Sequence, residues 1–218
     1  MYTLIINLKT YEEATGKNLN KITSAVKKLQ YKARKSNVQI ILAVPAVDIS
    51  SVEGVNVYSQ HVDPFEYGAH TGYVLPTHVK NAGARGTLLS HSEKYLDVEQ
   101  IKKTLPLIKK AGLQVCVCAR DVKRAKELSK LNVDFIAVEP PELIGGDISV
   151  STAKPGLISN SVKACGKKAL LVGAGVKNAQ DVRVAVQLGA KGILVASGVI
   201  KAKNTEKAID DLLNGFAK

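Results

Sequence analysis

Short apolar runs of four to seven residues recur along the whole chain, and most are followed by a longer segment with helical spacing and charge. The runs are rich in Val, Ile and Leu with little polar alternation, which is typical of parallel strands buried on both faces. Eight runs predict strands: Thr3–Leu8, Val38–Val44, Val55–Ser59, Gly86–Leu89, Leu113–Cys118, Val133–Val138, Ala169–Val172 and Gly192–Val195.

The segments between the runs predict helices at Asn18–Ser36, Val98–Ala111, Val122–Lys130, Gly156–Ala164, Ala179–Leu188 and Thr205–Phe216. Gly112 and Gly189 stand where two helices should stop, because glycine accepts the left-handed conformation that ends many helices. Eight strand-then-helix units without a linker indicate an α/β chain that forms a single (β/α)8 TIM barrel, residues 1–218, as one domain. An open, doubly wound sheet is the alternative fold.

The chain is short for such a barrel, since its 218 residues lie near the lower limit of roughly 200. We therefore expect trimmed helices and less cover over the outside of the strands. One long stretch, Gln60–Pro76, has neither pattern and exceeds the about 12–15 residues beyond which a loop usually has a function or takes part in an interaction.

The composition fits a globular chain outside the membrane. Hydrophobic residues make up 45% and charged residues 23%, and no apolar run approaches the ~20 residues of a membrane-spanning helix. The first residues lack the basic segment and cleavage site of a signal peptide, so we expect a cytoplasmic protein. The three cysteines, Cys116, Cys118 and Cys165, are too few for a disulfide framework and match no zinc pattern.

The net charge of +12 is compatible with a nucleic-acid-binding protein or with an enzyme that attracts a phosphorylated substrate. The basic residues form scattered pairs, such as Lys27-Lys28 and Lys109-Lys110, and no dense basic arm. Aromatic residues make up only 5% and tryptophan is absent, which disfavours base stacking. We expect neither a nucleic acid nor a membrane as partner.

Polar residues at strand ends are the candidates for chemistry, because active sites of such barrels lie at the carboxyl ends of the strands. Asn7 and Lys9 end the first strand, and their spacing of two directs both side chains to one side. His91 follows the fourth strand and precedes a helical turn, whose amino end disfavours the charged imidazolium. Glu139 leaves the sixth strand, where burial would raise the pKa of its carboxyl toward that of a general base. Each residue also has an ordinary structural interpretation at a strand end.

Two glycine-containing turns, Gly173–Gly175 and Ala196–Gly198, follow strands seven and eight. Small residues let backbone N–H groups approach an anion, and these loops are the usual phosphate site of this barrel. Asn178 stands where a dinucleotide-binding motif would need its third glycine, so we expect no dinucleotide. The Gly145-Gly146 pair after Glu139 favours a moving lid.

Together these motifs resemble triosephosphate isomerase in order and spacing, over nearly the whole chain. The motifs are Asn7-x-Lys9, His91-Ser92-Glu93, Val138-Glu139-Pro140-Pro141 with Ile144-Gly145, and the two turns. The short length and the Pro-Pro-Glu-Leu-Ile-Gly segment are similar to the compact archaeal branch of that family. The resemblance implies interconversion of dihydroxyacetone phosphate and D-glyceraldehyde 3-phosphate by proton transfer through an enediolate, in glycolysis and gluconeogenesis, without cofactor or metal.

The resemblance also implies four catalytic residues, following acid–base chemistry already known for the family. Glu139 would be the base that moves a carbon-bound proton to the neighbouring carbon. Neutral His91 would polarise the carbonyl and carry the hydroxyl proton. Lys9 would supply positive charge, and Asn7 would orient the substrate oxygens.

Further residues take supporting roles in the same way. Glu93 would pair with Lys9, and Ser92 would hold Glu139 before the lid closes. The substrate phosphate would bind backbone amides near Gly145, Gly175, Ala196 and Ser197.

The sequence differs from the residues that are more frequent in the family at the lid and at the turn after strand seven. The lid has Gly146 and Asp147 where Thr and Gly are frequent, and the turn has Val172 and Gly175 where Tyr and Ser are frequent. Lid closure must then use different hydrogen bonds, and we expect Asp147 to point away from the phosphate.

The resemblance implies a homo-oligomer, because in the family the loop after strand three inserts into a neighbouring subunit. Here that loop is 62–76, with Thr71 near its tip. We expect a homotetramer, with a dimer as the alternative.

Other functions stay open on the residues alone. Another sugar-phosphate isomerase or a Schiff-base aldolase would share the two phosphate-type turns, and Lys9 would be the aldolase nucleophile. Borohydride trapping of substrate on Lys9 would favour the aldolase. A barrel that binds phosphate without catalysis is a third possibility, against which the intact Lys9, His91 and Glu139 argue.

Overall fold

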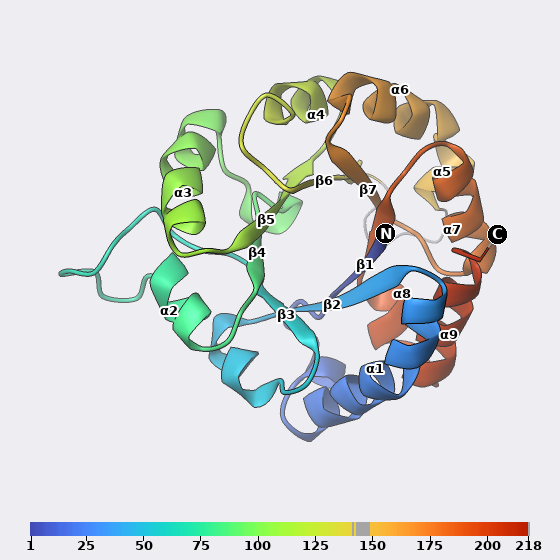
Figure 1. Ribbon diagram of the computed structural model, residues 1–218, viewed down its shortest axis with the longest axis horizontal. Helices are drawn as coiled ribbons and strands as arrows, with labels where there is room; N and C mark the ends of the chain where they lie inside the picture. The colour runs from blue at the N-terminus through green and yellow to red at the C-terminus, as the bar shows by residue number, and fades with distance from the viewer. Residues whose placement is uncertain (141, 143–148, 218) are drawn as a thin grey trace.

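A computed structural model describes residues 1–140, 142 and 149–217 of the chain (Figure 1). Its eight parallel strands form a closed barrel in chain order. They are β1 (Tyr2–Asn7), β2 (Val38–Val44), β3 (Asn56–Ser59), β4 (Gly86–Leu89), β5 (Gln114–Ala119), β6 (Phe135–Val138), β7 (Ala169–Gly173) and β8 (Gly192–Val195). Because β8 pairs with β1, with Thr3 opposite Gly192, the sheet closes. The predicted barrel is confirmed, and the open doubly wound sheet is wrong.

The predicted strands match the observed ones to within two residues at each end. The largest difference is at β6, which begins at Phe135 where the apolar pattern predicts a start at Val133. Asp134 explains the later start, because its carboxylate accepts the backbone N–H of Val115 at 2.7 Å and also pairs with Lys109. Asp134, just before β6, thus links this strand to β5 and α3.

Helices form the outer layer of the barrel (Figure 1). They are α1 (Lys17–Lys35), α2 (Pro76–Asn81), α3 (Val98–Lys110), α4 (Val122–Leu128), α5 (Val150–Ala153), α6 (Pro155–Cys165), α7 (Ala179–Gln187), α8 (Ser197–Ile200) and α9 (Thr205–Asn214). The described residues also include the 3-10 helices η1 (Glu12–Ala14), η2 (Ala46–Ser51) and η3 (Ser92–Lys94). The six predicted helices are confirmed, whereas the short ones escaped prediction because they are too brief to show a period. No helix among the described residues is long and apolar enough to cross a membrane.

The helix ends follow the polar residues beside them. Asp97 begins α3 with a reciprocal pair of bonds to Gln100, and Asn178 accepts the backbone N–H of Asp181 to begin α7. Gly112 and Gly189 have positive φ angles of 68° and 100° just after α3 and α7, as predicted. Asn178, which interrupts the dinucleotide motif, therefore serves as a helix cap.

Two apolar layers hold the barrel together. Alternate strand residues such as Ile5, Cys116 and Cys118 fill the barrel interior, and the residues between them pack outward against the helices. The three cysteines are free and buried. Near the amino end of the interior, the Tyr58 hydroxyl donates to Gln114 Oε1 at 2.7 Å.

The expected trimming of helices is clearest after β2. There the chain forms only the six-residue 3-10 helix η2, where a full helix would cover the outside of β2 and β3. The loop after β3 is the other irregular region: residues 60–75 have neither helix nor strand, and Pro76 begins α2. Figure 1 shows this loop projecting from the barrel beside α2.

Candidate active site

The carboxyl ends of β1, β4, β6, β7 and β8 meet around one cavity. Asn7, Lys9, His91 and Glu139 line it, together with the turns at 174–177 and 195–198. The structure thus brings together the four residues that the motifs single out as catalytic, from three separate parts of the chain.

Glu139 is 6% exposed, and its Oε2 atom has no hydrogen-bond partner among the described residues. Burial raises the pKa of the Glu139 carboxyl above its usual range. The neighbouring His91, a hydrogen bond with Cys118 and the charge of Lys9 act in the opposite direction, while Glu93 adds to the increase. The site therefore contains a dehydrated carboxylate with one oxygen left for a reacting proton.

Gly173 makes room for that carboxylate. A Cβ atom at this position would lie 2.5 Å from Cγ and 2.6 Å from Oε1 of Glu139, closer than packed atoms approach. The motifs predict only phosphate binding for the turn that begins at Gly173. The structure adds that Gly173, the last residue of β7, lies against the side chain of Glu139.

His91 is oriented by the short helix η3. Its Nδ1 atom accepts the backbone N–H of Glu93 at 3.2 Å, so His91 acts as the amino-terminal cap of that helix. Because Nδ1 is an acceptor, we assign the proton of the neutral ring to Nε2. Nε2 lies 3.6 Å from Glu139 Oε2, so an N–H donor faces the space beside the candidate base.

Lys9 lies next to this pair, with its Nζ atom 2.6 Å from Glu93 Oε1. Only 13% of the Lys9 side chain is exposed, compared with 57% for Glu93. Asn7 fixes the turn, because its Oδ1 atom accepts the backbone N–H of Lys9 at 3.0 Å. The expected pairing of Lys9 with Glu93 is present in the structure.

Gln60 is a site residue that sequence reasoning missed. Its Nε2 atom lies within hydrogen-bond distance of Asn7 Oδ1 (3.2 Å), the Lys9 carbonyl (2.9 Å) and the Ala43 carbonyl (3.3 Å). Gln60 therefore fastens the end of β1 to the end of β2. Its position directly after the third strand could have indicated a site residue. Its contacts could not be predicted, because they join three segments that are distant in the sequence.

The backbone is strained where the site is built. Lys9, Ser90 and Ala174 have positive φ angles of 49°, 57° and 71°, a region that residues other than glycine rarely enter. All three follow the carboxyl end of a strand. Ser90 holds its conformation by exchanging two 3.1 Å bonds between its hydroxyl and the backbone of Leu96.

The expected phosphate-binding residues line the same cavity, apart from the lid. Gly175 has a φ of 71°, Ala196 caps α8 and Ser197 begins it. The first N–H groups of a helix have no partner within the helix, so the start of α8 at Ser197 is suited to an anion. Gly145, Gly146 and Asp147 lie outside the described residues.

Ser92 lies on the other side of Glu139. It lines a hollow of about 260 Å³ together with Cys118, Arg120 and Glu139. The free Oε2 atom of Glu139 takes no hydrogen bond from Ser92 in this arrangement. The role expected for Ser92 therefore stays a prediction.

Comparison with known proteins places these features in a family. A family model described as triosephosphate isomerase matches residues 2–212. The chain belongs to the triosephosphate isomerase family. A curated triosephosphate isomerase of Thermoplasma volcanium is 41% identical over 218 residues, covering 98% of this chain and all of the relative. One from Saccharolobus solfataricus is 42% identical over 216 residues, covering 96% and 94%. The resemblance drawn from the motifs is confirmed.

A solved structure agrees on the fold. The crystal structure of triosephosphate isomerase from Bartonella henselae superposes with a TM-score of 0.70, covering 97% of this chain and 98% of that one. Its sequence identity is 18%, so it supports the shared barrel and nothing finer.

Proposed function

We propose that this protein interconverts dihydroxyacetone phosphate and D-glyceraldehyde 3-phosphate, as an aldose–ketose isomerase of glycolysis and gluconeogenesis. Membership of the triosephosphate isomerase family supports the reaction. The observation that carries the mechanism is the buried Glu139 carboxylate with its unpartnered Oε2 atom, 3.6 Å from His91 Nε2.

The reaction would move two protons. Glu139 takes a proton from C1 of dihydroxyacetone phosphate, and the electron pair left on carbon shifts to the carbonyl oxygen to give an enediolate. His91 Nε2–H polarises that oxygen and carries the hydroxyl proton from one enediolate oxygen to the other. Glu139 then returns its proton to C2, which gives the aldehyde. No electron acceptor or other cofactor takes part.

Lys9 and Asn7 would act on the oxygens where negative charge develops. The Lys9 ammonium is largely enclosed, and electrostatic stabilisation is strongest where water is excluded. Asn7 and Gln60 set the position of Lys9 through the hydrogen bonds to its backbone. Glu93 holds Nζ in place while the site is empty of substrate.

The phosphate of the substrate would bind at the other side of the cavity. The amides near Gly175, Ala196 and Ser197 are suited to an anion, and we keep Gly145 as the expected contribution of the lid. A phosphate held there orients the three-carbon chain toward Glu139.

A coupled assay for both directions tests the reaction and its base. We expect Glu139→Gln to lower kcat by roughly 10²–10⁴-fold, because general-base catalysis contributes that much. Glu206→Gln is the matched control, because Glu206 is an exposed glutamate that pairs with Lys28 on the outside of the barrel. Inactive wild-type protein would refute the function, and an active Glu139→Gln variant would refute the base.

We also propose that the chain assembles with itself through the loop 62–76, as a tetramer in preference to a dimer. The loop presents aromatic side chains: Tyr67 is 65% and Tyr73 48% exposed, and Phe65 stacks on His70 with ring centres 4.4 Å apart. Light scattering should give four times the chain mass, and Tyr67→Ser should shift it toward smaller species. An active monomer would refute the assembly.

A cytoplasmic location is part of the same proposal. All three cysteines are free and buried, which suits a reducing compartment. Cell fractionation with an antibody against the chain would test it, and recovery outside the cytoplasmic fraction would contradict it.

A further inference from the structure

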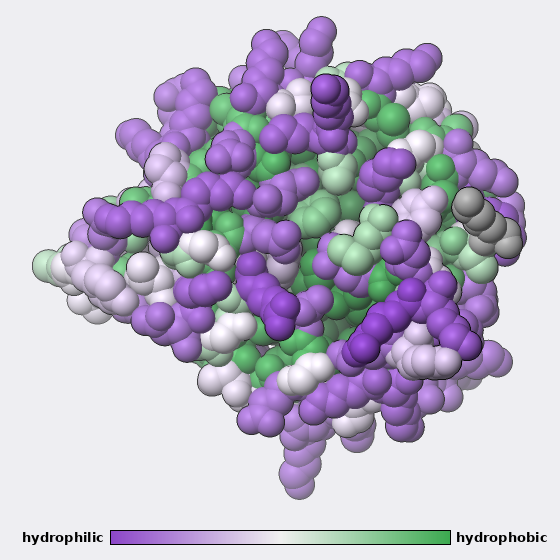
Figure 2. Space-filling model, viewed as in Figure 1, coloured by the Kyte–Doolittle hydropathy of each residue, from purple (hydrophilic) through white to green (hydrophobic). Residues whose placement is uncertain are grey.

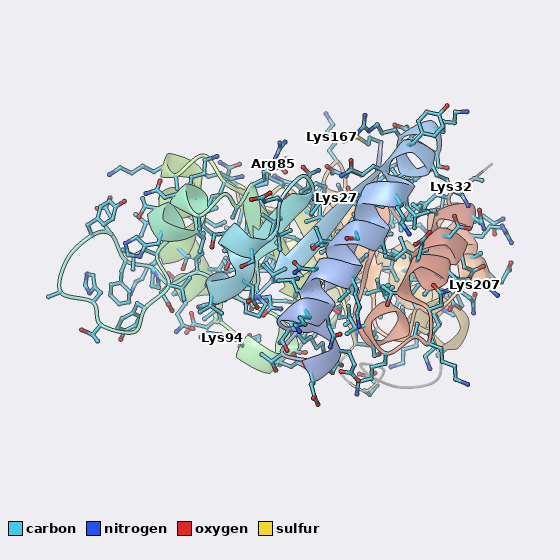
Figure 3. The ribbon with its side chains drawn as sticks, turned by 90° about the horizontal axis from the view of Figure 1, so that it is seen from below. Lys27, Lys32, Arg85, Lys94, Lys167 and Lys207 are labelled. Atoms are coloured by element: carbon cyan, nitrogen blue, oxygen red, sulfur yellow. The ribbon has the colours of Figure 1, made fainter. Side chains whose placement is uncertain are left out.

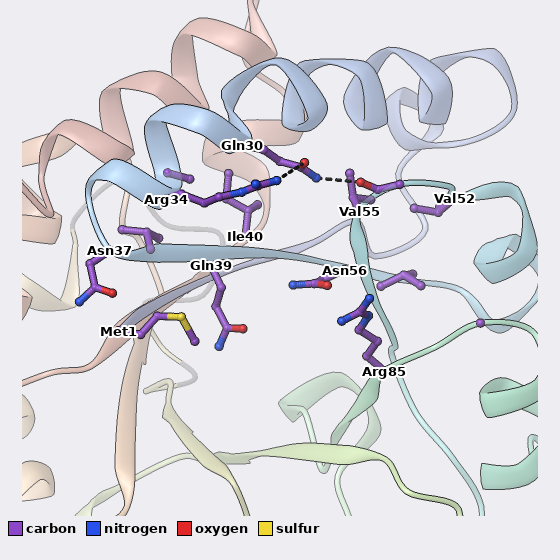
Figure 4. Close-up of a pocket in the computed structure, with 15 residues that line it drawn as sticks. Met1, Gln30, Arg34, Asn37, Gln39, Ile40, Val52, Val55, Asn56 and Arg85 are labelled. Atoms are coloured by element: carbon purple, nitrogen blue, oxygen red, sulfur yellow. Dashed lines mark hydrogen bonds between the residues drawn. The ribbon is translucent and has the colours of Figure 1, made fainter.

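A second cavity, of about 600 Å³, lies at the opposite end of the barrel from the candidate active site (Figure 4). It is bounded by the last turns of α1, the start of β2 and the start of β3, and Arg85 borders it from the approach to β4. Figure 3 shows the separation: Arg85, before β4, lies on the upper side and Lys94, after β4, on the lower side. Small-molecule sites have volumes of roughly 300–1,000 Å³.

The cavity exists because the chain after β2 is trimmed. The 3-10 helix η2 gives little cover beside the amino ends of β2 and β3, and Val38, Ile40 and Val57, each only 3–6% exposed, form the apolar bottom of the cavity. In Figure 2, which looks onto the amino end as Figure 1 does, hydrophobic surface is visible between hydrophilic side chains. This agrees with the expectation that short helices cover less of the outside of the strands.

The rim of the cavity is basic and rich in amides. Its polar lining consists of Gln30, Arg34, Asn37, Gln39, Asn56 and Arg85, with no carboxylate among the lining residues. Gln30 donates to the Gly54 carbonyl at 2.8 Å and accepts from Arg34 at 3.4 Å, which ties α1 to the segment before β3. These bonds fix one wall of the cavity.

Arg85 is an unpaired charge at this end, as far as the described residues show. Within the part of the chain that the structure describes, its guanidinium has neither an ion pair nor a hydrogen bond, and the Asn56 side chain next to it also has no hydrogen bond. Asp134, just before β6, is already held by Lys109 and the Val115 amide. An adjoining hollow shares Arg85 and Asn56 and adds Lys80, again with no carboxylate in its lining.

An apolar floor beside the amides of Asn37 and Asn56 and the guanidinium of Arg85 matches one class of ligand. Guanidinium groups bind phosphate oxygens through paired N–H donors, and side-chain amides bind the polar edge of a nucleobase. A flat, weakly polar ring system would cover the valine and isoleucine floor. We propose that this cavity binds a nucleoside monophosphate, with its phosphate at Arg85 and its base over the floor, toward the α1 wall that carries Arg34 (Figure 4). The site is separate from the one that acts on triose phosphates.

Calorimetric titration of the full chain with adenosine monophosphate tests the proposal. Saturating triose phosphate is present throughout, so that the active site is occupied and cannot account for the signal. We expect saturable one-to-one binding, with weaker binding of adenosine alone and of inorganic phosphate alone. Absence of saturable binding, or competition by triose phosphate, would overturn the site.

Variants locate the ligand. Arg85→Met should weaken binding about ten- to a hundredfold, because it removes a charged hydrogen-bond donor, and Arg34→Met should weaken it too. Arg183→Met is the matched control, because Arg183 is an exposed arginine on α7 that bonds only to Gln180 within the described residues. Equal affinity of Arg85→Met and wild type would overturn the proposal, and inorganic phosphate binding as tightly as the nucleotide would overturn the ligand class. Thermal unfolding of each variant checks that it is folded.

Discussion

The two ends of the barrel use charge in opposite ways. At the carboxyl end, Glu139, His91 and Lys9 are enclosed and contact one another or Glu93 at 2.6–3.6 Å. At the amino end, Arg34 and Arg85 stand exposed around an apolar floor. Burial raises the pKa of a carboxyl and leaves it able to take a proton, whereas an exposed arginine can only bind.

Backbone strain also differs between the two ends of the barrel. Lys9, Ser90 and Ala174 carry positive φ angles at the carboxyl end, while Asn37 is the single such residue other than glycine at the amino end among the described residues. Residues before strands, such as Asp134, mainly join neighbouring strands and helices. This barrel therefore concentrates backbone strain and enclosed charge at its carboxyl end, where catalysis needs side chains in fixed positions.

The sharpest test of this comparison removes one lysine from each end. Lys9→Met should lower kcat/KM by about 10²–10³-fold, because the enclosed ammonium stabilises charge that develops in the transition state. Lys167→Met, an exposed lysine before β7 at the amino end (Figure 3), should leave kcat/KM unchanged. Steady-state kinetics of both variants provide the measurement. A similar loss in both would mean that overall positive charge, and not position, matters.

A pair of glycine substitutions comes next. Gly173→Ala should lower kcat by about 10²-fold, because its Cβ displaces the Glu139 carboxylate from its working position. Gly156→Ala in α6 should keep full activity and stabilise the fold by about 0.5–1 kcal/mol, because its Cβ meets nothing within 4 Å in a helix. Kinetics and denaturant unfolding check both. Full activity in Gly173→Ala would show that the position of Glu139 is less constrained than its contacts indicate.

The pH profile of kcat/KM should reveal the environment of Glu139. The base works deprotonated, so activity is present above its pKa and is lost as the pH falls through it. Because burial raises that pKa, the acid limb should lie above the ordinary glutamate value of about 4.3. Glu93→Gln should move the limb to lower pH, because the Glu93 charge raises the Glu139 pKa.

The substrate phosphate titrates equally in both proteins, so the difference between the two profiles isolates Glu139. Glu206→Gln, far from the site, should leave the limb in place. A limb that moves to higher pH in Glu93→Gln would contradict the assigned electrostatics.

The smallest expected effect is on stability. A carboxyl whose folded pKa is raised adds stability below its unfolded pKa, and that stability is lost as the pH rises through the folded value. At pH 7 the buried Glu139 charge therefore weakens the fold, and Glu139→Gln should be more stable than wild type. The gain should disappear near pH 4. Urea unfolding at the two pH values measures it, and a variant less stable at pH 7 would contradict the cost of burial.

The sequence could predict what local patterns encode. Val- and Ile-rich runs predicted the buried strands. The geometry of a barrel then indicated that Asn7, Lys9, His91 and Glu139 would lie close together. It could not predict contacts that join distant segments. The Gln60 amide, after β3, hydrogen-bonds to the ends of β1 and β2. Gly173 leaves space for the side chain of Glu139, which follows β6. The cavity at the amino end forms only where α1, β2 and β3 meet.

The most direct test of the central claim follows a proton. Dihydroxyacetone phosphate is incubated with the protein in D₂O, and the product is examined by NMR. Because Glu139 exchanges its proton with solvent while the enediolate exists, wild type should yield D-glyceraldehyde 3-phosphate with deuterium on C2, and Glu139→Gln should yield neither product nor exchange at a comparable rate. Rapid deuterium incorporation by Glu139→Gln would show that another group is the base and would contradict the account.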